Sequence, residues 1–169
     1  PEMLMECLVT QPEPESVLAY IHRRQGKWRE ARAELERVAA REPNALNYEE
    51  ELFATSTLLR DWDAAARHGD RLLKLAPVLP QVRIERAYLE IWRRGDLAPV
   101  GKVFAEYTDD GDPEGDVTWA RWDAAMIARH YAAAEAALAQ FHLEMMTSVF
   151  GAPLPKSYLE GCTALAQGA

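Results

Sequence analysis

Two stretches of the chain share one pattern: Gly26-Lys-Trp28-Arg-Glu-Ala31 and Arg60-Asp-Trp62-Asp-Ala-Ala65. Their tryptophans are 34 residues apart, and so are the alanines that stand three positions after each tryptophan. The prolines that follow the two stretches, Pro43 and Pro77, keep the same separation. Three matched pairs at one period indicate an internal repeat, and a fixed period of about 20 to 50 residues is typical of stacked repeat architectures.

Two weaker copies follow. The third begins at Gly95-Asp-Leu97 and continues through Val100 and Phe104, one residue later than the period requires. The fourth begins at Arg129-His-Tyr131 and continues through Ala134 and Leu138. The pattern therefore extends over most of the chain.

These residues resemble the tetratricopeptide repeat family, whose unit is a helix-turn-helix of 34 residues. That unit has a small residue between its helices, an aromatic residue opening the second helix, a small residue one turn later and a closing proline. The resemblance covers about residues 12–147 and divides them into repeats at 12–45, 46–79, 80–114 and 115–147. Repeats three and four depart from the family pattern, because Pro99 stands in the first turn of a predicted helix and Arg129 replaces the usual glycine.

Hydrophobic periodicity supports the same division. Val17, Leu18 and Ile21 fall on one face of a predicted helix that Gly26 ends, since glycine accepts a left-handed backbone without steric cost. Small Ala31 and Ala65 are expected where paired helices approach closely. The predicted helices span about 14–25, 28–41, 47–59, 62–75, 80–94, 97–107, 116–128, 131–147 and 156–167.

We therefore expect an all-α fold: a right-handed superhelix (α-solenoid) of about four helix-turn-helix repeats plus a C-terminal helix at 156–167. Residues 1–169 are predicted to form a single domain. Both ends of the sequence look like interrupted repeats, so we expect a fragment of a longer chain. A second resemblance, on Trp119–Tyr131 and Pro153–Gly161, is to the repeat regions of large bacterial signalling proteins.

Composition limits the classes of partner. The 169 residues include 19 Lys and Arg against 27 Asp and Glu, a net charge of −8. An acidic chain is not expected to bind nucleic acid or an anionic membrane, because both depend on basic side chains. No apolar run approaches the roughly 20 residues of a membrane-spanning helix. We expect a cytoplasmic protein that has a protein or peptide partner.

No catalytic constellation is visible, and we predict neither an enzyme nor a cofactor. The four histidines lack metal-ligand spacing, and no serine stands in a Gly-x-Ser-x-Gly turn. The acidic run at 109–116 imitates the start of a calcium loop, yet its twelfth position is Arg121 instead of a bidentate Glu. Two interpretations remain open: a weak cation site, and a connector whose Asp116 caps the next helix.

The family resemblance implies that the first helices of successive repeats line a concave groove for peptides or partner helices. At those positions the side chains expected in the groove are Tyr20, Arg23, Arg24, Asn47, Glu50, Thr57, Glu85, Leu89, Trp92, Arg93, Trp119, Asp123 and Met126. The mixture of charge, amide and aromatic groups suits an extended peptide or a helix. Binding of chaperone carboxyl-terminal tails is not expected, because Glu51 stands where the family's carboxylate clamp needs a cationic or amide group.

The tryptophans have two interpretations. Trp28 and Trp62 are expected in the core, filling the wedge between helix pairs. Trp119 and Trp122 either pack between repeats or form an aromatic surface in the groove, together with Trp92.

The sequence thus predicts a non-enzymatic scaffold that binds a peptide or partner helix. Two alternatives remain. One is a structural spacer or dimerisation module, with a homodimer formed through exposed repeat ends. The other is a ligand-sensing repeat domain with a small molecule in the groove.

Overall fold

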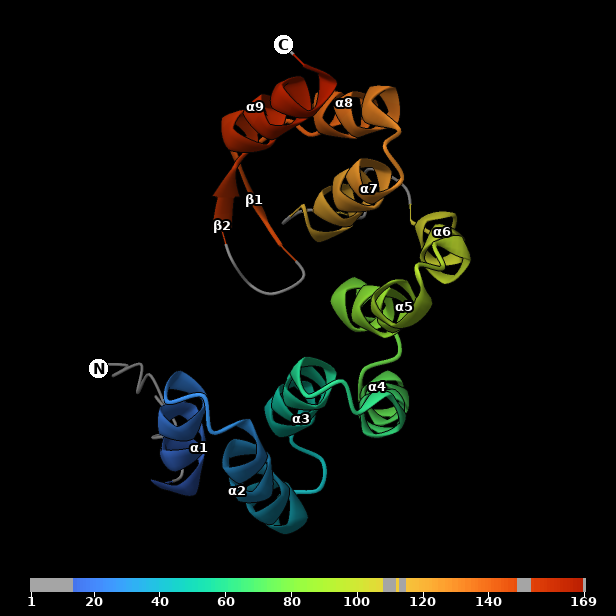
Figure 1. Cartoon of the computed structure of the whole chain (residues 1–169). Helices are drawn as coiled ribbons and strands as arrows, with labels where there is room; N and C mark the ends of the chain where they lie inside the picture. Colours follow the sequence, from blue (N-terminus) through green and yellow to red (C-terminus); the bar gives the residue numbers. More distant parts are fainter. Residues whose placement is uncertain (1–13, 108–111, 113–114, 149–152, 169) are drawn as a thin grey trace, which may run out of the picture. The chain divides into compact units, whose positions relative to one another are not determined.

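The computed structural model describes residues 14–107, 112, 115–148 and 153–168. This part of the chain is mostly helical, which confirms the all-α class, and it contains one small antiparallel sheet (Figure 1). In chain order the elements are α1 Pro14–Arg24, α2 Trp28–Arg41, α3 Leu46–Leu58, α4 Trp62–Leu75, α5 Pro80–Arg94, α6 Ala98–Phe104, α7 Asp116–Ile127, α8 Tyr131–Gln140, β1 Met145–Thr147, β2 Pro153–Pro155 and α9 Lys156–Gln167.

The chain divides into two compact units, residues 1–68 and 69–169, and the division falls inside α4. In the first unit α1 packs on α2, and α2 packs on α3. Its core contains Leu35, Val38, Tyr48 and Leu52. In the second unit α5 contacts α6 and α7, and α8 contacts both α7 and α9.

Left-handed backbone angles recur along the chain at the spacing of the sequence pattern. Four residues have left-handed φ angles at the turns that join paired helices: Gly26 at 75°, Arg60 at 56°, Gly95 at 73° and Arg129 at 57°. These residues are 34, 35 and 34 positions apart. Arg60 and Arg129 adopt this conformation although a side chain with a Cβ atom disfavours it. The backbone therefore adopts a left-handed φ angle at all four turns, including the two where arginine stands in place of glycine.

Hydrogen bonds close three of these turns in one way. The amide that follows the left-handed residue donates to a carbonyl five residues earlier: Lys27 to His22 at 2.8 Å, Asp61 to Ser56 at 3.0 Å and His130 to Ala125 at 2.8 Å. This is the Schellman bond that satisfies the last carbonyls of a helix. Five residues after each turn, Ala31, Ala65, Val100 and Ala134 are almost completely buried. The prediction of a small buried residue at Ala31 and Ala65 is confirmed.

The sequence prediction is wrong for two features. Trp28 and Trp62 are half-buried and lie outside the core clusters, because each stands at the first turn of its helix beside the inter-helix turn. The helix predicted at 131–147 ends at Gln140. Residues 145–147 instead form β1, which pairs with β2 in the register Met145↔Pro155, Met146↔Leu154 and Thr147↔Pro153.

The short sheet belongs to the core of the second unit. Met146 and Phe141 are buried there together with Tyr88, Trp119 and Trp122. Proline cannot donate to a strand ladder and is confined to edges, so the two prolines of β2 are compatible only with a ribbon of this kind. The sheet is seen between α7 and α9 in Figure 1.

Candidate functional site

Three residues predicted for the groove meet in one pocket of the first unit. Tyr20, Arg23 and Arg24 come from α1, and Trp28 of α2 and Glu51 of α3 complete the wall. The cavity has a volume of about 460 Å³. It forms because positions three and four apart on α1 share a face.

Inside this α1–α3 pocket the charges are arranged around Arg23. Its guanidinium forms an ion pair with Glu51 and lies 5.9 Å from the centre of the Trp28 ring. Burial, then the Glu51 carboxylate, raises the pKa of the Tyr20 hydroxyl, which also hydrogen-bonds that carboxylate. Burial and the neighbouring Glu51 charge raise the pKa of Glu50 as well. Arg23 thus holds an aromatic ring and a carboxylate in fixed positions.

Arg24 differs from Arg23. Its side chain is exposed, and within the described ranges it forms neither a hydrogen bond nor an ion pair. The pocket therefore places the unpaired Arg24 guanidinium beside the ion-paired Arg23 guanidinium. The Tyr20 phenol and the Trp28 indole complete this part of its wall. Such a group of side chains can bind an acidic or polar group together with an apolar side chain.

The remaining predicted residues of the first unit do not join this pocket. Asn47 is exposed. Thr57 is half-buried, and its hydroxyl donates to the Phe53 carbonyl of its own helix at 2.9 Å. Glu50 lies beside Glu51 in sequence but does not line the cavity.

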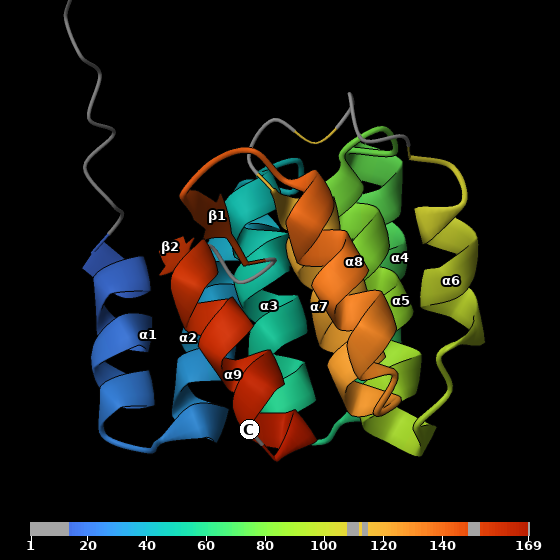
Figure 2. The same cartoon turned by 90° about the horizontal axis from the view of Figure 1, so that it is seen from above.

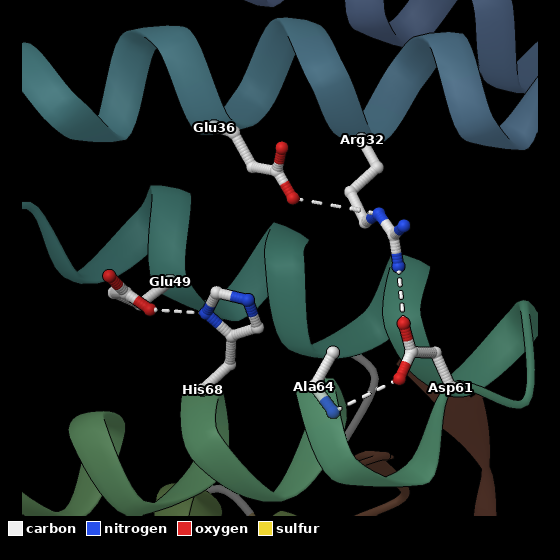
Figure 3. Close-up of polar contacts among 6 residues, drawn as sticks. All are labelled: Arg32, Glu36, Glu49, Asp61, Ala64 and His68. Carbon is white, nitrogen blue, oxygen red and sulfur yellow. Dashed lines mark hydrogen bonds and ion pairs between the residues drawn. The ribbon is translucent and has the colours of Figure 1, made fainter.

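Two separate groups of polar contacts lie on the first unit, one around Arg32 and Asp61 and the other between Glu49 and His68 (Figure 3). Arg32 Nη1 donates to Asp61 Oδ2 at 2.7 Å, and Asp61 Oδ1 accepts from the Ala64 amide at 3.2 Å. The Ala64 amide and then Arg32 lower the pKa of Asp61. His68 Nδ1 lies 2.8 Å from Oε2 of buried Glu49. The sequence did not predict either pair, because Arg32 and Asp61 lie 29 residues apart and Glu49 and His68 lie 19 residues apart.

In the second unit several predicted groove residues are interior. Leu89 is 0% exposed, Trp119 is 7% and Glu85 is 8%. The prediction that these three side chains line an open surface is wrong for this structure, because α5 and α7 pack directly against each other. Of the two interpretations of Trp119 and Trp122, packing between repeats is the one that their burial supports.

An aromatic cluster organises that interior. The Tyr88 ring lies 5.7 Å from the Trp92 ring and 6.3 Å from the Trp119 ring, measured between centroids. The Tyr88 hydroxyl reaches Asp123, a half-buried member of the predicted set. Tyr88 was not predicted as a site residue. Met126 packs half-buried against the same core, while Arg93 is exposed.

Positions at equal distances before the four left-handed turns share one pattern of burial. The residues three positions before each left-handed turn are all half-buried: Arg23, Thr57, Trp92 and Met126. The residues two positions before it are all exposed: Arg24, Leu58, Arg93 and Ile127. The helices that precede the four left-handed turns therefore expose and bury the same positions of their last turn.

The acidic run is described only at Asp112 and from Gly115 onward. Asp112 is buried, and its carboxylate accepts from the Val117 amide at 3.0 Å, the Thr118 amide at 2.7 Å and the Thr118 hydroxyl at 2.6 Å. Asp112 therefore caps α7, and the prediction that Asp116 does so is wrong. The N-cap position of α7 is Gly115, which has no side chain to cap the helix, and the Asp112 carboxylate accepts from the first helical amides instead.

Within the described ranges, no three side chains of His, Cys, Asp or Glu come together as a metal site. No helix in these ranges is both long and apolar enough to span a membrane.

Comparison of the sequence with protein-family models finds no match, and the curated proteins and solved structures give none either. The function proposed below is therefore inferred from the geometry of the chain's own residues.

Proposed function

We propose that the chain is a non-enzymatic helical repeat protein of the tetratricopeptide type, which binds a peptide or a partner helix. The recurrence of one left-handed turn and one burial pattern at 34 or 35 residues supports the repeat assignment. The same recurrence favours a right-handed superhelix.

The α1–α3 pocket is the binding site in this proposal. The observation that carries it is the meeting of Tyr20, Arg23 and Arg24 with Trp28 and Glu51 around one open cavity. Aromatic and arginine side chains supply most of the binding energy at protein interfaces. Arg23 is held in place by Glu51 and Trp28, so its ordering costs little entropy on binding.

A peptide array probed with the full chain tests this proposal. Peptides retained on the array are then measured in solution by fluorescence anisotropy. Arg24→Ala should weaken binding about tenfold, as expected for loss of a charge-assisted hydrogen bond. Arg67→Ala is the matched control, because Arg67 is an exposed arginine outside the pocket.

Equal binding by wild type, Arg24→Ala and Arg67→Ala would place the peptide elsewhere. Absence of any specific peptide, with circular dichroism showing a folded chain, would contradict peptide binding by this protein.

The second candidate function is a dimerisation module. Val17, Leu18 and Ile21 form an exposed apolar face on α1, and Tyr158 and Leu165 are exposed on α9. Repeat arrays cover such terminal faces with capping helices or other subunits. Light scattering over a hundredfold concentration range tests this candidate: a constant monomer mass would contradict it, and a dimer lost in Leu18→Ser would support it.

A further inference from the structure

Helix α1 exposes an apolar face. Val17, Leu18 and Ile21 are all exposed, and none of them lines the α1–α3 pocket. A helix whose outer face meets solvent ordinarily presents charged and polar side chains there. On α4, for comparison, all five exposed residues are charged: Asp63, Arg67, Asp70, Arg71 and Lys74. We call Val17, Leu18 and Ile21 the α1 face.

The next repeat shows what covers the same position elsewhere in the chain. Leu18 stands eight residues before the left-handed turn of its repeat, and Leu52 stands eight residues before the following one. Leu18 is 40% exposed, whereas Leu52 is 2% exposed. Leu52 belongs to one buried cluster with Leu35, because α2 packs on α3. Among the described elements none precedes α1, so its face lacks the neighbour that α2 provides for α3.

Helices that precede left-handed turns also contact one another directly in the second unit. The Tyr88 hydroxyl of α5 lies 3.0 Å from the Ala120 carbonyl oxygen of α7. Trp122 Nε1 of α7 donates to the Thr163 hydroxyl of α9 at 2.9 Å. Tyr88 and Trp122 both stand seven residues before their left-handed turns. Helices α7, α8 and α9 are seen lengthwise in Figure 2.

The positions that receive these contacts correspond to the α1 face. Ala120 stands nine residues before the left-handed turn of α7, as Val17 does before that of α1. Thr163 stands five residues before left-handed Gly168, as Ile21 does before the turn of α1. Ala120 and Thr163 are buried, whereas Val17 and Ile21 are exposed. The α1 face is therefore built from positions that a preceding helix covers elsewhere in the chain.

Helix α9 exposes the opposite kind of face. Gly161 stands seven residues before Gly168, at the position from which α5 and α7 contact the following helix, yet it is exposed. Tyr158 and Leu165 lie three and four residues to either side of Gly161, on the same side of the helix, and both are exposed. We call Tyr158, Gly161 and Leu165 the α9 face. It consists of positions with which a helix contacts the one that follows it.

We infer that α9 of one copy of the chain packs on α1 of a second copy, so that the α9 face meets the α1 face. The contact repeats the relation of α5 to α7 and of α7 to α9, in which one face of a helix meets a different face of the next. This inference rests on the second candidate function, the dimerisation module, and it specifies which two surfaces meet.

Side-chain size favours this pairing over a symmetric one. Gly161 has no side chain, and a Cβ atom there would meet no atom within 4 Å, so the α9 face leaves space between its two large residues. Ile21 or Leu18 of the second copy fits into that space. Two α1 faces packed on each other would instead place large aliphatic side chains against large aliphatic side chains.

A contact between two different faces leaves one face of each kind unpaired in a dimer. Such a heterologous contact extends into a ring or an open chain of copies, whereas a symmetric contact stops at two. Sedimentation velocity of the full chain over about a hundredfold range of concentration measures this difference. The average mass should rise with concentration and pass beyond that of a dimer.

Two variants, each altered in one face, test which surfaces meet. Ile21→Lys and Leu165→Lys each place an unpaired charge in the apolar contact, and each should weaken self-association at least about tenfold. An equimolar mixture of the two should form a dimer that contains one copy of each, because one intact α9 face and one intact α1 face remain. This dimer should not grow further.

Leu58→Lys is the matched control. Leu58 is an exposed leucine of α3 that belongs to neither face. Its replacement should leave self-association within about twofold of wild type. Circular dichroism should show the wild-type unfolding temperature for all three lysine variants, since none of the three side chains is buried.

Three results would overturn the inference. A constant monomer mass would contradict both the inference and the dimerisation module. A dimer that Ile21→Lys dissociates and Leu165→Lys does not would show a symmetric contact between α1 faces, which keeps the dimerisation module but not the inference. Equal weakening by Leu58→Lys would place the contact on another surface. Peptide binding in the α1–α3 pocket is measured separately with Arg24→Ala, so these results leave that proposal standing.

Discussion

The hydroxyl oxygen of Tyr88 lies 3.0 Å from Asp123 Oδ2 and also 3.0 Å from the carbonyl oxygen of Ala120. A phenol has one proton, so it can donate fully to only one of these oxygens. Burial raises the pKa of Asp123, although the hydrogen bond from Tyr88 acts in the opposite direction. A protonated Asp123 would donate to Tyr88, and Tyr88 to Ala120, which satisfies all three groups.

This arrangement predicts a pH dependence of stability. Because the folded-state pKa of Asp123 is raised, its contribution is most favourable below the unfolded-state pKa of about 3.9. The contribution is lost as pH rises through the folded-state pKa. Asp123→Asn cannot titrate, so its stability relative to wild type should increase with pH across that window. Urea unfolding of both proteins from pH 3.5 to 7 measures the difference, and a difference that stays flat or falls would contradict the prediction.

The left-handed arginines predict stabilising substitutions. Arg60→Gly and Arg129→Gly should each raise the free energy of unfolding by about 0.5–1 kcal/mol, because glycine removes a strain of about 1–2 kcal/mol but loses more backbone entropy. Gly26→Ala is the reciprocal change and should lower the free energy of unfolding by about 1 kcal/mol. A Cβ atom at this position would meet no atom within 4 Å, so the loss comes only from the left-handed φ angle. Denaturant unfolding checks the signs, and a destabilised Arg129→Gly would show that its side chain has a separate structural role.

Gly115 is predicted to tolerate no side chain. A Cβ atom there would lie 2.6 Å from Met146 Cβ and 2.7 Å from Phe141 Cζ, and its φ angle is 81°. Gly115→Ala should therefore cost about 2–5 kcal/mol, the sum of left-handed strain of about 1–2 and overpacking of about 1–3 kcal/mol. Gly95→Ala provides the control, because Gly95 has a similar φ of 73° and open space around it. Thermal unfolding of the Gly115→Ala and Gly95→Ala variants separates backbone strain from overpacking. An equal loss of stability in the two variants would mean that Met146 and Phe141 move aside.

The cap of α7 predicts which aspartate matters. Asp112→Ala should cost about 1–2 kcal/mol, because it leaves the Val117 and Thr118 amides without their buried acceptor. Asp116→Ala should cost only a few tenths of a kcal/mol, as expected for a first-turn residue that interacts with the helix dipole. Urea unfolding ranks the two variants, and the reverse ranking would restore Asp116 as the capping residue.

Part of the candidate site follows from sequence alone. Tyr20, Arg23 and Arg24 are spaced three and four apart, so any helix over this segment brings them to one face. Their meeting with Glu51 required knowledge of how α3 lies against α1 and α2, and no local pattern contains it. The pairing of His68 with Glu49 has the same origin.

Equivalent positions also show where the repeat pattern stops being informative. Tyr20 and Leu89 both stand six residues before a left-handed turn, yet Tyr20 is 36% exposed and Leu89 is 0% exposed. Helical periodicity gives the face of a side chain. Whether a neighbouring helix covers that face depends on the packing of α5 against α7, which the period leaves undetermined.

The sequence by itself determined the helices, their pairing and the positions of the turns, because period, proline and glycine act within a few residues of the chain. It also determined the small buried residues Ala31 and Ala65, since close helix contact requires them at that spacing. Only the tertiary structure decided that α8 ends at Gln140 and that β1 returns to pair with β2, because the burial of Met146 among distant side chains outweighs local helix preference. It likewise decided where space remains: α6 packs on α5, and a cavity lined mainly by leucine, valine, phenylalanine and alanine side chains stays open between α6, α7 and α8.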